Sequence, residues 1–209
     1  MTKYHKIQTV YKRDKDNNFK TLLVGEYSLP CFEYLAENEW VFTEKVDGTN
    51  IRVMWDGENI TYGGRTDNAQ IPATLYSRLT EIFGGKESVF FDKFGHGKTC
   101  LYGEGHGAKI QKGGGNYCTG QDFVLFDVLA GEWWLKRADV VDVSETFNIG
   151  VVPVIGRGTL GDMCKMAQGG IVSNWGDFRA EGIVARPEIE LKTRGGERII
   201  TKIKCKDFQ

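Results

Sequence analysis

The sequence has no long apolar run, no charge excess and no cysteine pair at close spacing. A membrane-spanning helix needs roughly 18 or more consecutive apolar residues, and no stretch approaches that length. The charged and aromatic start, Met1–Lys6, lacks the apolar core of a secretion signal. These absences argue against a membrane or exported protein and lead us to expect a cytoplasmic one.

The cysteines are few and scattered along the chain: Cys31, Cys100, Cys118, Cys164 and Cys205. An odd set without a Cys-x-x-Cys pair predicts neither a disulfide framework nor a zinc site. The net charge is −1, so contacts with nucleic acid would have to be local. What remains, 41% apolar and 12% aromatic residues, is typical of a globular protein.

The stretch Glu44–Asn50, with the sequence EKVDGTN, carries a candidate nucleophile. Lys45 can attack a phosphate only when its amine is uncharged, which burial or neighbouring cations would favour. Gly48 leaves room for a phosphate close to the backbone. Asp47 and Asn50 can hold a sugar or a metal-bound water.

Local patterns predict a strand on each side of this stretch, Trp40–Val46 and Thr49–Trp55. Asp56-Gly57 predicts a hairpin turn into a strand over Asn59–Tyr62. Pro72–Phe83 has the apolar spacing of a helix that ends at two glycines. Ser28–Glu37 reads as a short helix with a serine cap.

Further strands are expected at Leu101–Gly105, ending in Glu104 between glycines, and at Asp122–Val128. Between them, His106–Tyr117 is rich in glycine and carries Lys109 and Lys112. This segment is either a loop for substrate phosphates or RNA, or a plain surface loop. His106, like His5 and His96, is expected to be a loop histidine rather than a metal ligand.

In the last third, Val151–Ile155 is expected to be a strand and Asp162–Ala167 a short helix stopped by glycines. Glu181–Arg186 reads as a strand that starts at a carboxylate. Ile199–Phe208 reads as a strand, on which Lys202, Lys204 and Lys206 would share one face.

The start of the chain, residues 3–20, mixes basic residues with Tyr4, His5 and Tyr11. Lysines between aromatic rings could follow a phosphate backbone and stack on bases. Acidic and amide residues dilute the charge, so a solvated edge strand and turn is the alternative.

The stretch Glu44–Asn50 resembles motif I of the covalent nucleotidyltransferases, the superfamily of ATP-dependent DNA ligases, RNA ligases and mRNA capping enzymes. Because Lys-x-Asp-Gly alone is a weak signal, the order of the other motifs decides. Leu101–Gly105, Asp122–Val128, Glu181–Arg186 and Ile199–Phe208 are similar to motifs III, IIIa, IV and V, in that order. Glu44 and Thr49-Asn50 resemble the RNA ligases, of the second, small phage-like type, more than the DNA ligases.

The resemblance implies a role for each matching residue. Lys45 would accept AMP, and Lys204 and Lys206 would contact the α-phosphate. Glu104 would bind the ribose, Phe126 would stack on the adenine, and Glu181 would bind a divalent metal. Arg65 would contact a substrate phosphate. The remaining nucleotide-binding residues would be Glu44, Asp47, Gly48 and Asn50.

The implied fold is α+β, an adenylation domain of two antiparallel sheets flanked by helices around a central nucleotide cleft. We expect residues 1–209 to form this one domain, without an OB-fold or other accessory domain, as a monomer. If the source is viral, the host cytoplasm is the expected location.

The implied reaction is ATP-dependent RNA ligation, as in RNA repair, with Mg²⁺ or Mn²⁺. RNA strands with 5′-phosphate and 3′-hydroxyl ends would be joined through lysyl-AMP and RNA-adenylate. The alternatives are a DNA ligase, a capping-type guanylyltransferase, or a non-catalytic RNA-binding relative.

Overall fold

The structure, a computed structural model, describes residues 3–208. The chain folds into two compact units. Unit 1 comprises residues 3–5 and Asp47–Val152, and unit 2 comprises Lys6–Val46 and residues 153–208. Each unit has its own sheet and its own apolar core, which confirms the α+β class. Within residues 3–208, no helix is both long and apolar enough to cross a membrane.

Unit 1 is built on a six-stranded sheet with the order β10-β8-β7-β5-β6, and β9 pairs with β8. Its pairs are antiparallel except β10 with β8. The strands are β5 (Thr49–Trp55), β6 (Ile60–Gly63), β7 (Thr99–Gly107), β8 (Gln121–Ala130), β9 (Trp133–Trp134) and β10 (Gly150–Val151).

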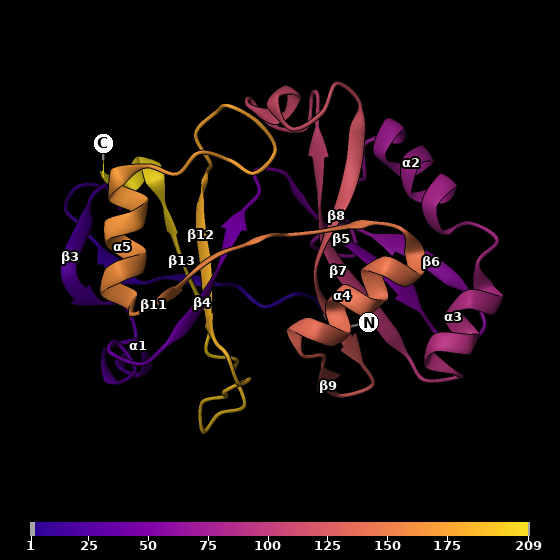
Figure 1. Cartoon of the computed structure of the whole chain (residues 1–209), viewed down its shortest axis with the longest axis horizontal. Helices are drawn as coiled ribbons and strands as arrows, with labels where there is room; N and C mark the ends of the chain where they lie inside the picture. The colour runs from indigo at the N-terminus through magenta and orange to yellow at the C-terminus, as the bar shows by residue number, and fades with distance from the viewer. Residues whose placement is uncertain (1–2, 209) are drawn as a thin grey trace. The chain divides into compact units, whose positions relative to one another are not determined.

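The α-helices described in unit 1 are α2 (Ala73–Phe83), α3 (Glu87–Phe94) and α4 (Arg137–Phe147). They pack beside the sheet (Figure 1). Alternate residues of the central strands, including Ile51, Leu101 and Leu125, meet apolar helix residues in one core. The other face of these strands is therefore left for polar side chains.

Unit 2 is built on a five-stranded sheet with the order β1-β13-β12-β4-β11. The strands are β1 (Gln8–Thr9), β4 (Trp40–Lys45), β11 (Val154–Gly158), β12 (Gly182–Pro187) and β13 (Thr201–Lys204). Helix α5 (Leu160–Gly169) packs on one face, where its apolar residues join Phe42, Ile183 and Ile203. A separate hairpin, β2 (Tyr11–Arg13) with β3 (Leu22–Tyr27), and the short helix α1 (Pro30–Tyr34) complete the unit.

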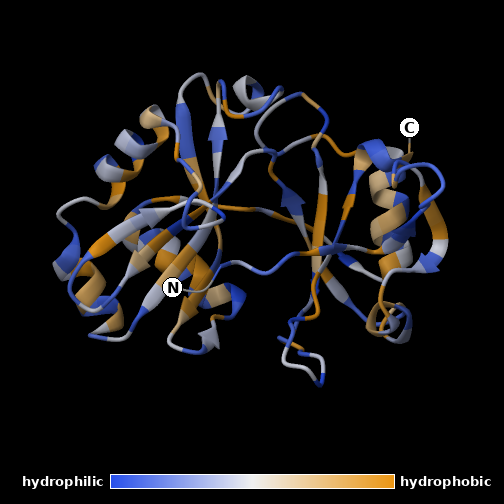
Figure 2. Cartoon of the chain, turned by 180° about the vertical axis from the view of Figure 1, so that it is seen from behind, coloured by the Kyte–Doolittle hydropathy of each residue, from blue (hydrophilic) through white to orange (hydrophobic). Residues whose placement is uncertain are grey.

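Hydropathy follows this plan (Figure 2). Hydrophilic and hydrophobic residues alternate along the strands and the helices, as expected of elements with one buried face. Burial of these apolar faces is the main driving force for folding each unit.

The hairpin and helix predictions around motif I are confirmed. Strands β4 and β5 lie where expected, and β5 pairs with β6 across the Asp56-Gly57 turn. The Asp56 carboxylate accepts the backbone N–H groups of Glu58 and Asn59, which closes that turn. Helix α2 begins after Pro72 and ends at Gly84.

Four predictions of local structure are wrong in detail. The stretch Val151–Ile155 is not one strand, because Val151 ends β10 in unit 1 and Val154 starts β11 in unit 2. Helix α1 begins after Leu29 without a side-chain cap, and the Ser28 hydroxyl donates to the Thr9 carbonyl instead. Glu104 does not end its strand, since β7 continues to Gly107.

The fourth correction concerns the C-terminal strand. Strand β13 ends at Lys204, and residues Cys205–Phe208 form a 3₁₀ helix. Lys206 lies in that helix and is exposed, so it does not share a strand face with Lys202 and Lys204. The Cys205 side chain is buried in the core of unit 2, as is that of Ile203.

Candidate active site

Lys45 ends β4 in a row of three residues across the sheet of unit 2. Gly182 of β12 lies opposite Lys45 on one side and opposite Lys204 of β13 on the other. Residues directly opposite on neighbouring strands point to the same face, so both lysines rise from the face that α5 does not cover. A Cβ on Gly182 would lie 2.1 Å from the Ile203 carbonyl oxygen, which explains the glycine between them.

Glu181 joins the two lysines of this row. Its Oε2 lies 2.5 Å from Nζ of Lys45, and its Oε1 lies 2.6 Å from Nζ of Lys204. All three side chains are largely but not fully buried, at 11% exposure for Glu181, 21% for Lys45 and 28% for Lys204. One carboxylate thus holds two amines on one face of the sheet.

Lys202 belongs to the same face and was not assigned a role from the sequence. It lies two residues before Lys204 on β13, opposite Val184 of β12. The face of β13 therefore carries Lys202 and Lys204, whereas Lys206 lies in the 3₁₀ helix that follows the strand. The pattern Lys-x-Lys occurs twice, as Lys202–Lys204 and as Lys204–Lys206. The sequence does not distinguish them, but β13 contains only the first pair because the strand ends at Lys204.

Glu44 points to the opposite face of β4, toward the core side. It is 1% exposed and accepts hydrogen bonds from the Ser173 hydroxyl at 2.6 Å and from the Asn174 backbone and side-chain amides at 2.9 and 3.1 Å. Its carboxylate is thus committed to the segment between α5 and β12. Nucleotide binding by Glu44 stays a prediction.

In unit 1, the face of the sheet away from the core carries polar residues in two rows. Asn50 of β5 lies opposite Glu104 of β7, which lies opposite Val124 of β8. Oδ1 of Asn50 is buried and accepts no hydrogen bond from any residue that the structure describes. A buried acceptor without a donor favours a ligand that brings one, such as a sugar hydroxyl.

The second row joins Arg52, Tyr102 and Asp127. Between these rows the register of β7 with β8 shifts, and Phe126 is the extra residue. Such a bulge turns neighbouring side chains toward the same side. Accordingly, the ring of Tyr4 lies 5.0 Å from that of Phe126, and its hydroxyl donates to Asp127 at 2.9 Å.

The buried position of Tyr4 overturns one reading of the N-terminal residues. Tyr4 is 8% exposed and packs against Tyr102 and Trp134, while Tyr11 is 6% exposed in the core of unit 2. These rings are not available for stacking on bases. The edge-strand alternative is the one that the structure supports.

Arg65 is exposed in the loop after β6, and within residues 3–208 it forms no ion pair. The loop is held by Arg52, a residue that the sequence analysis passed over. Arg52 is 1% exposed, donates to the Gly64 carbonyl at 2.8 Å and pairs with Asp67 at 2.8 Å. This hydrogen bond holds the pKa of Asp67 below its ordinary value. The sequence did offer a sign of this role, because an arginine flanked by apolar residues in a strand needs a buried hydrogen-bond partner.

His106 is buried within β7, so the expectation of a loop histidine is wrong. Burial lowers its pKa, which favours the neutral ring. The segment that follows β7 contains a short 3₁₀ helix, Gly114–Asn116. Lys109 and Lys112 precede this helix, and both are exposed. Its binding to phosphates or RNA stays a prediction.

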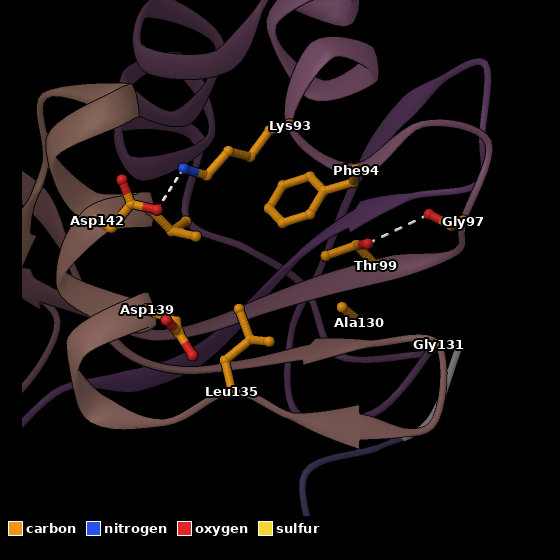
Figure 3. A pocket seen from close by; sticks show the side chains of 10 residues that line it. Lys93, Phe94, Gly97, Thr99, Ala130, Gly131, Leu135, Asp139 and Asp142 are labelled. Carbon is orange, nitrogen blue, oxygen red and sulfur yellow. Dashed lines mark hydrogen bonds and ion pairs between the residues drawn. The ribbon is translucent and has the colours of Figure 1, made fainter.

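No group of three or more His, Cys, Asp or Glu residues in the described part of the chain is arranged to hold a metal ion. A hollow of about 530 Å³ in unit 1 lies among α3, α4, β7 and β8 (Figure 3). It contains the Lys93–Asp142 ion pair and the carboxylate of Asp139, but none of the predicted site residues.

Solved structures with the same fold come from an RNA ligase of Naegleria gruberi. A mutant without ligand matches with a TM-score of 0.65 at 18% identity, covering 100% of this chain and 59% of that one. A mutant with ATP and Mn matches with a TM-score of 0.68 at 20% identity, covering 98% and 56%. The form with PPi gives 0.64 at 20% identity, covering 98% and 58%.

At this level of identity these matches show the fold, and the chain spans less than two thirds of the length of the ligase it matches. No curated protein matches the sequence. The family model described as RNA ligase matches residues 38–204, from just before β4 to the end of β13. This match covers most of the chain, so the protein belongs to the RNA ligase family.

Proposed function

We propose that this chain carries out ATP-dependent RNA ligation through a covalent AMP on Lys45. The observation that carries the proposal is the row Lys45–Gly182–Lys204 with Glu181 beside it. It puts a candidate nucleophilic amine and a second amine on one face, with a glycine at the strand position between them and the Glu181 carboxylate joining them. The sequence order of the motifs and membership of the RNA ligase family supply the reaction.

In the first step, Nζ of Lys45 attacks the α-phosphorus of ATP. A P–N bond forms, the bond to pyrophosphate breaks, and the amine proton passes to solvent. Lys204 and Lys202 neutralise the charge that builds on the phosphate oxygens, which is where such displacements gain most of their catalysis. Glu104 and Asn50 are proposed to bind the ribose, and Phe126 to stack on the adenine.

In the second step, a 5′-phosphate oxygen of RNA attacks the lysyl-AMP phosphorus. A P–O–P bond forms, the P–N bond breaks, and the lysine nitrogen takes up a proton from solvent, which gives RNA-adenylate and free Lys45. In the third step, the 3′-hydroxyl of the other end attacks the 5′-phosphate, a phosphodiester forms, and AMP leaves. Arg65 is proposed to hold a substrate phosphate, because Arg52 fixes the loop that bears it.

A divalent metal fits this site only as a partner of the triphosphate. Magnesium is usually held by one or two carboxylates together with substrate phosphates, and Glu181 is the carboxylate that the row offers. When bound, the ion neutralises phosphate charge. The N. gruberi ligase was solved with ATP and Mn, in accord with such a requirement.

Intact mass after incubation with ATP and Mg²⁺ tests the first step. The protein should gain one adenylyl group, Lys45→Ala should gain none, and Lys45→Arg should also gain none although it keeps the charge. Labelled GTP and nicked DNA distinguish the capping and DNA-ligase alternatives. An unmodified wild-type protein in the presence of ATP and either Mg²⁺ or Mn²⁺ would overturn the proposal.

A further inference from the structure

The glycine-rich segment after β7 holds the backbone of motif I. The Asp47 N–H donates to the Tyr117 hydroxyl at 3.1 Å, and Gln111 Nε2 donates to the Gly48 carbonyl at 3.1 Å. All four residues belong to unit 1. Two side chains of one segment thus bind the two ends of the Asp47–Gly48 dipeptide.

The segment is itself held in place. The Ala108 N–H donates to the Gly120 carbonyl at 2.8 Å, and the Tyr117 N–H donates to the Gly114 carbonyl at 3.1 Å. The Tyr117 side chain is buried, and its ring meets the His106 ring edge-on at 5.7 Å. The Tyr117 hydroxyl therefore reaches Asp47 from a fixed position.

Motif I is packed on the opposite side as well. A Cβ on Gly48 would lie 2.2 Å from the Gly105 carbonyl oxygen and 2.8 Å from Cγ of Glu104. The next residue, Thr49, starts β5 opposite Gly105. The backbone of residues 47–49 is thus confined by β7 and by the glycine-rich segment.

We propose that Tyr117 and Gln111 are positioning residues for the transfer of AMP to Lys45. The proposal rests on the proposed function. Their hydrogen bonds fix the orientation of the Asp47–Gly48 backbone. This orientation in turn sets where the Asp47 side chain points and how the backbone runs on from Lys45. Displacement reactions lose rate steeply when the reacting groups shift by about 1 Å. Neither side chain needs to touch the nucleotide to act in this way.

The test compares Tyr117→Phe and Gln111→Ala with Tyr76→Phe, whose ring is 51% exposed on α2 of the same unit. Single-turnover adenylylation is followed by intact mass at several ATP concentrations. One lost hydrogen bond should slow the limiting rate roughly 2- to 10-fold in each of the two variants. The ATP concentration for half-maximal rate should stay within about twofold, and Tyr76→Phe should match wild type.

Hydrogen exchange of the Asp47 amide provides the readout that a general loss of stability would not mimic. In Tyr117→Phe this amide should exchange faster while amides in the middle of β7 keep their protection. The Gln111 side chain is exposed, so Gln111→Ala is expected to fold even if Tyr117→Phe does not.

The outcomes separate the two proposals. A wild-type protein that takes up no AMP overturns the proposed function and this inference with it. If the wild-type protein is adenylylated and both Tyr117→Phe and Gln111→Ala react as fast as wild type, only the positioning role is overturned. Slower variants with an unchanged ATP requirement support it.

Discussion

Nζ of Lys45 lies 2.5 Å from Oε2 of Glu181, although 136 residues separate them in the chain. The pairing of β4 with β12 brings them together, since Lys45 lies opposite Gly182. The ion-pair partner of the candidate nucleophile is therefore a carboxylate. Lys204 shares this carboxylate, so one anion bridges the two amines of the row.

The first prediction concerns this ion pair. Glu181→Gln should leave two lysines adjacent without their shared counter-charge and lower the free energy of unfolding by roughly 1–3 kcal/mol. Lys45→Met should relieve part of that cost, so the double variant should be more stable than the sum of the single effects predicts. Urea unfolding of the four proteins measures the coupling. Strict additivity would show that the pair contributes nothing to stability.

The second prediction separates the lysines near the C-terminus. Lys202→Ala should slow covalent AMP attachment roughly 100- to 1,000-fold, the loss expected when one preorganised charge contact is removed. Lys206→Ala, in an exposed 3₁₀ helix, should change it by less than about threefold. Intact-mass time courses with ATP and Mg²⁺ give both rates. A larger loss in Lys206→Ala would restore the sequence assignment.

The third prediction concerns the buried carboxylate of Glu44. Glu44→Gln replaces one acceptor oxygen by a donor that faces the donors of Ser173 and Asn174, so it should cost roughly 1.5–3 kcal/mol. Ser173→Ala should cost about 1 kcal/mol. Glu37→Gln on the exposed surface serves as the control and should stay within about 0.5 kcal/mol of wild type in urea unfolding. An equal effect at both glutamates would refute the anchoring role.

The fourth prediction is a pH dependence. Burial lowers the pKa of His106, so in acid the unfolded chain takes up this proton before the folded protein does. The neutral His106 ring contributes its full stability above the pKa of histidine in the unfolded chain, about 6.5. This contribution is lost as the pH falls toward the lower pKa of the folded protein. Below about pH 6.5, His106→Gln should show a flatter fall of unfolding free energy than wild type, by at most about 1.4 kcal/mol per pH unit. Parallel curves would contradict it.

The fifth prediction concerns the thiols. Burial raises the pKa of Cys100 and of Cys164 to about 11, and the thiolate is the form that reacts. In the folded protein at pH 7.5, iodoacetamide should modify neither, and both should react after unfolding in urea. Peptide mass mapping identifies the sites. Cys118, which is half-buried, provides the internal comparison.

Local sequence patterns determined much of the fold. The alternation in β4 and β5, the Asp-Gly turn and the apolar stripe of α2 are short-range features, and each was predicted close to its observed bounds. Helices α3 and α4 were missed, as was the division of residues 151–155 between two units.

Motif I and the order of the later motifs were enough to place the chain among the RNA ligases, as the family model confirms. What the tertiary structure alone decided is which side chains meet. Strand register put Gly182 between Lys45 and Lys204, and the end of β13 left Lys202, but not Lys206, on the strand face of Lys204. Ser173 and Asn174, in the segment after α5, donate hydrogen bonds to the Glu44 carboxylate. The physical reason is that local residue patterns encode which elements form and where turns lie. Strand register and strand ends depend instead on packing between segments far apart in the chain.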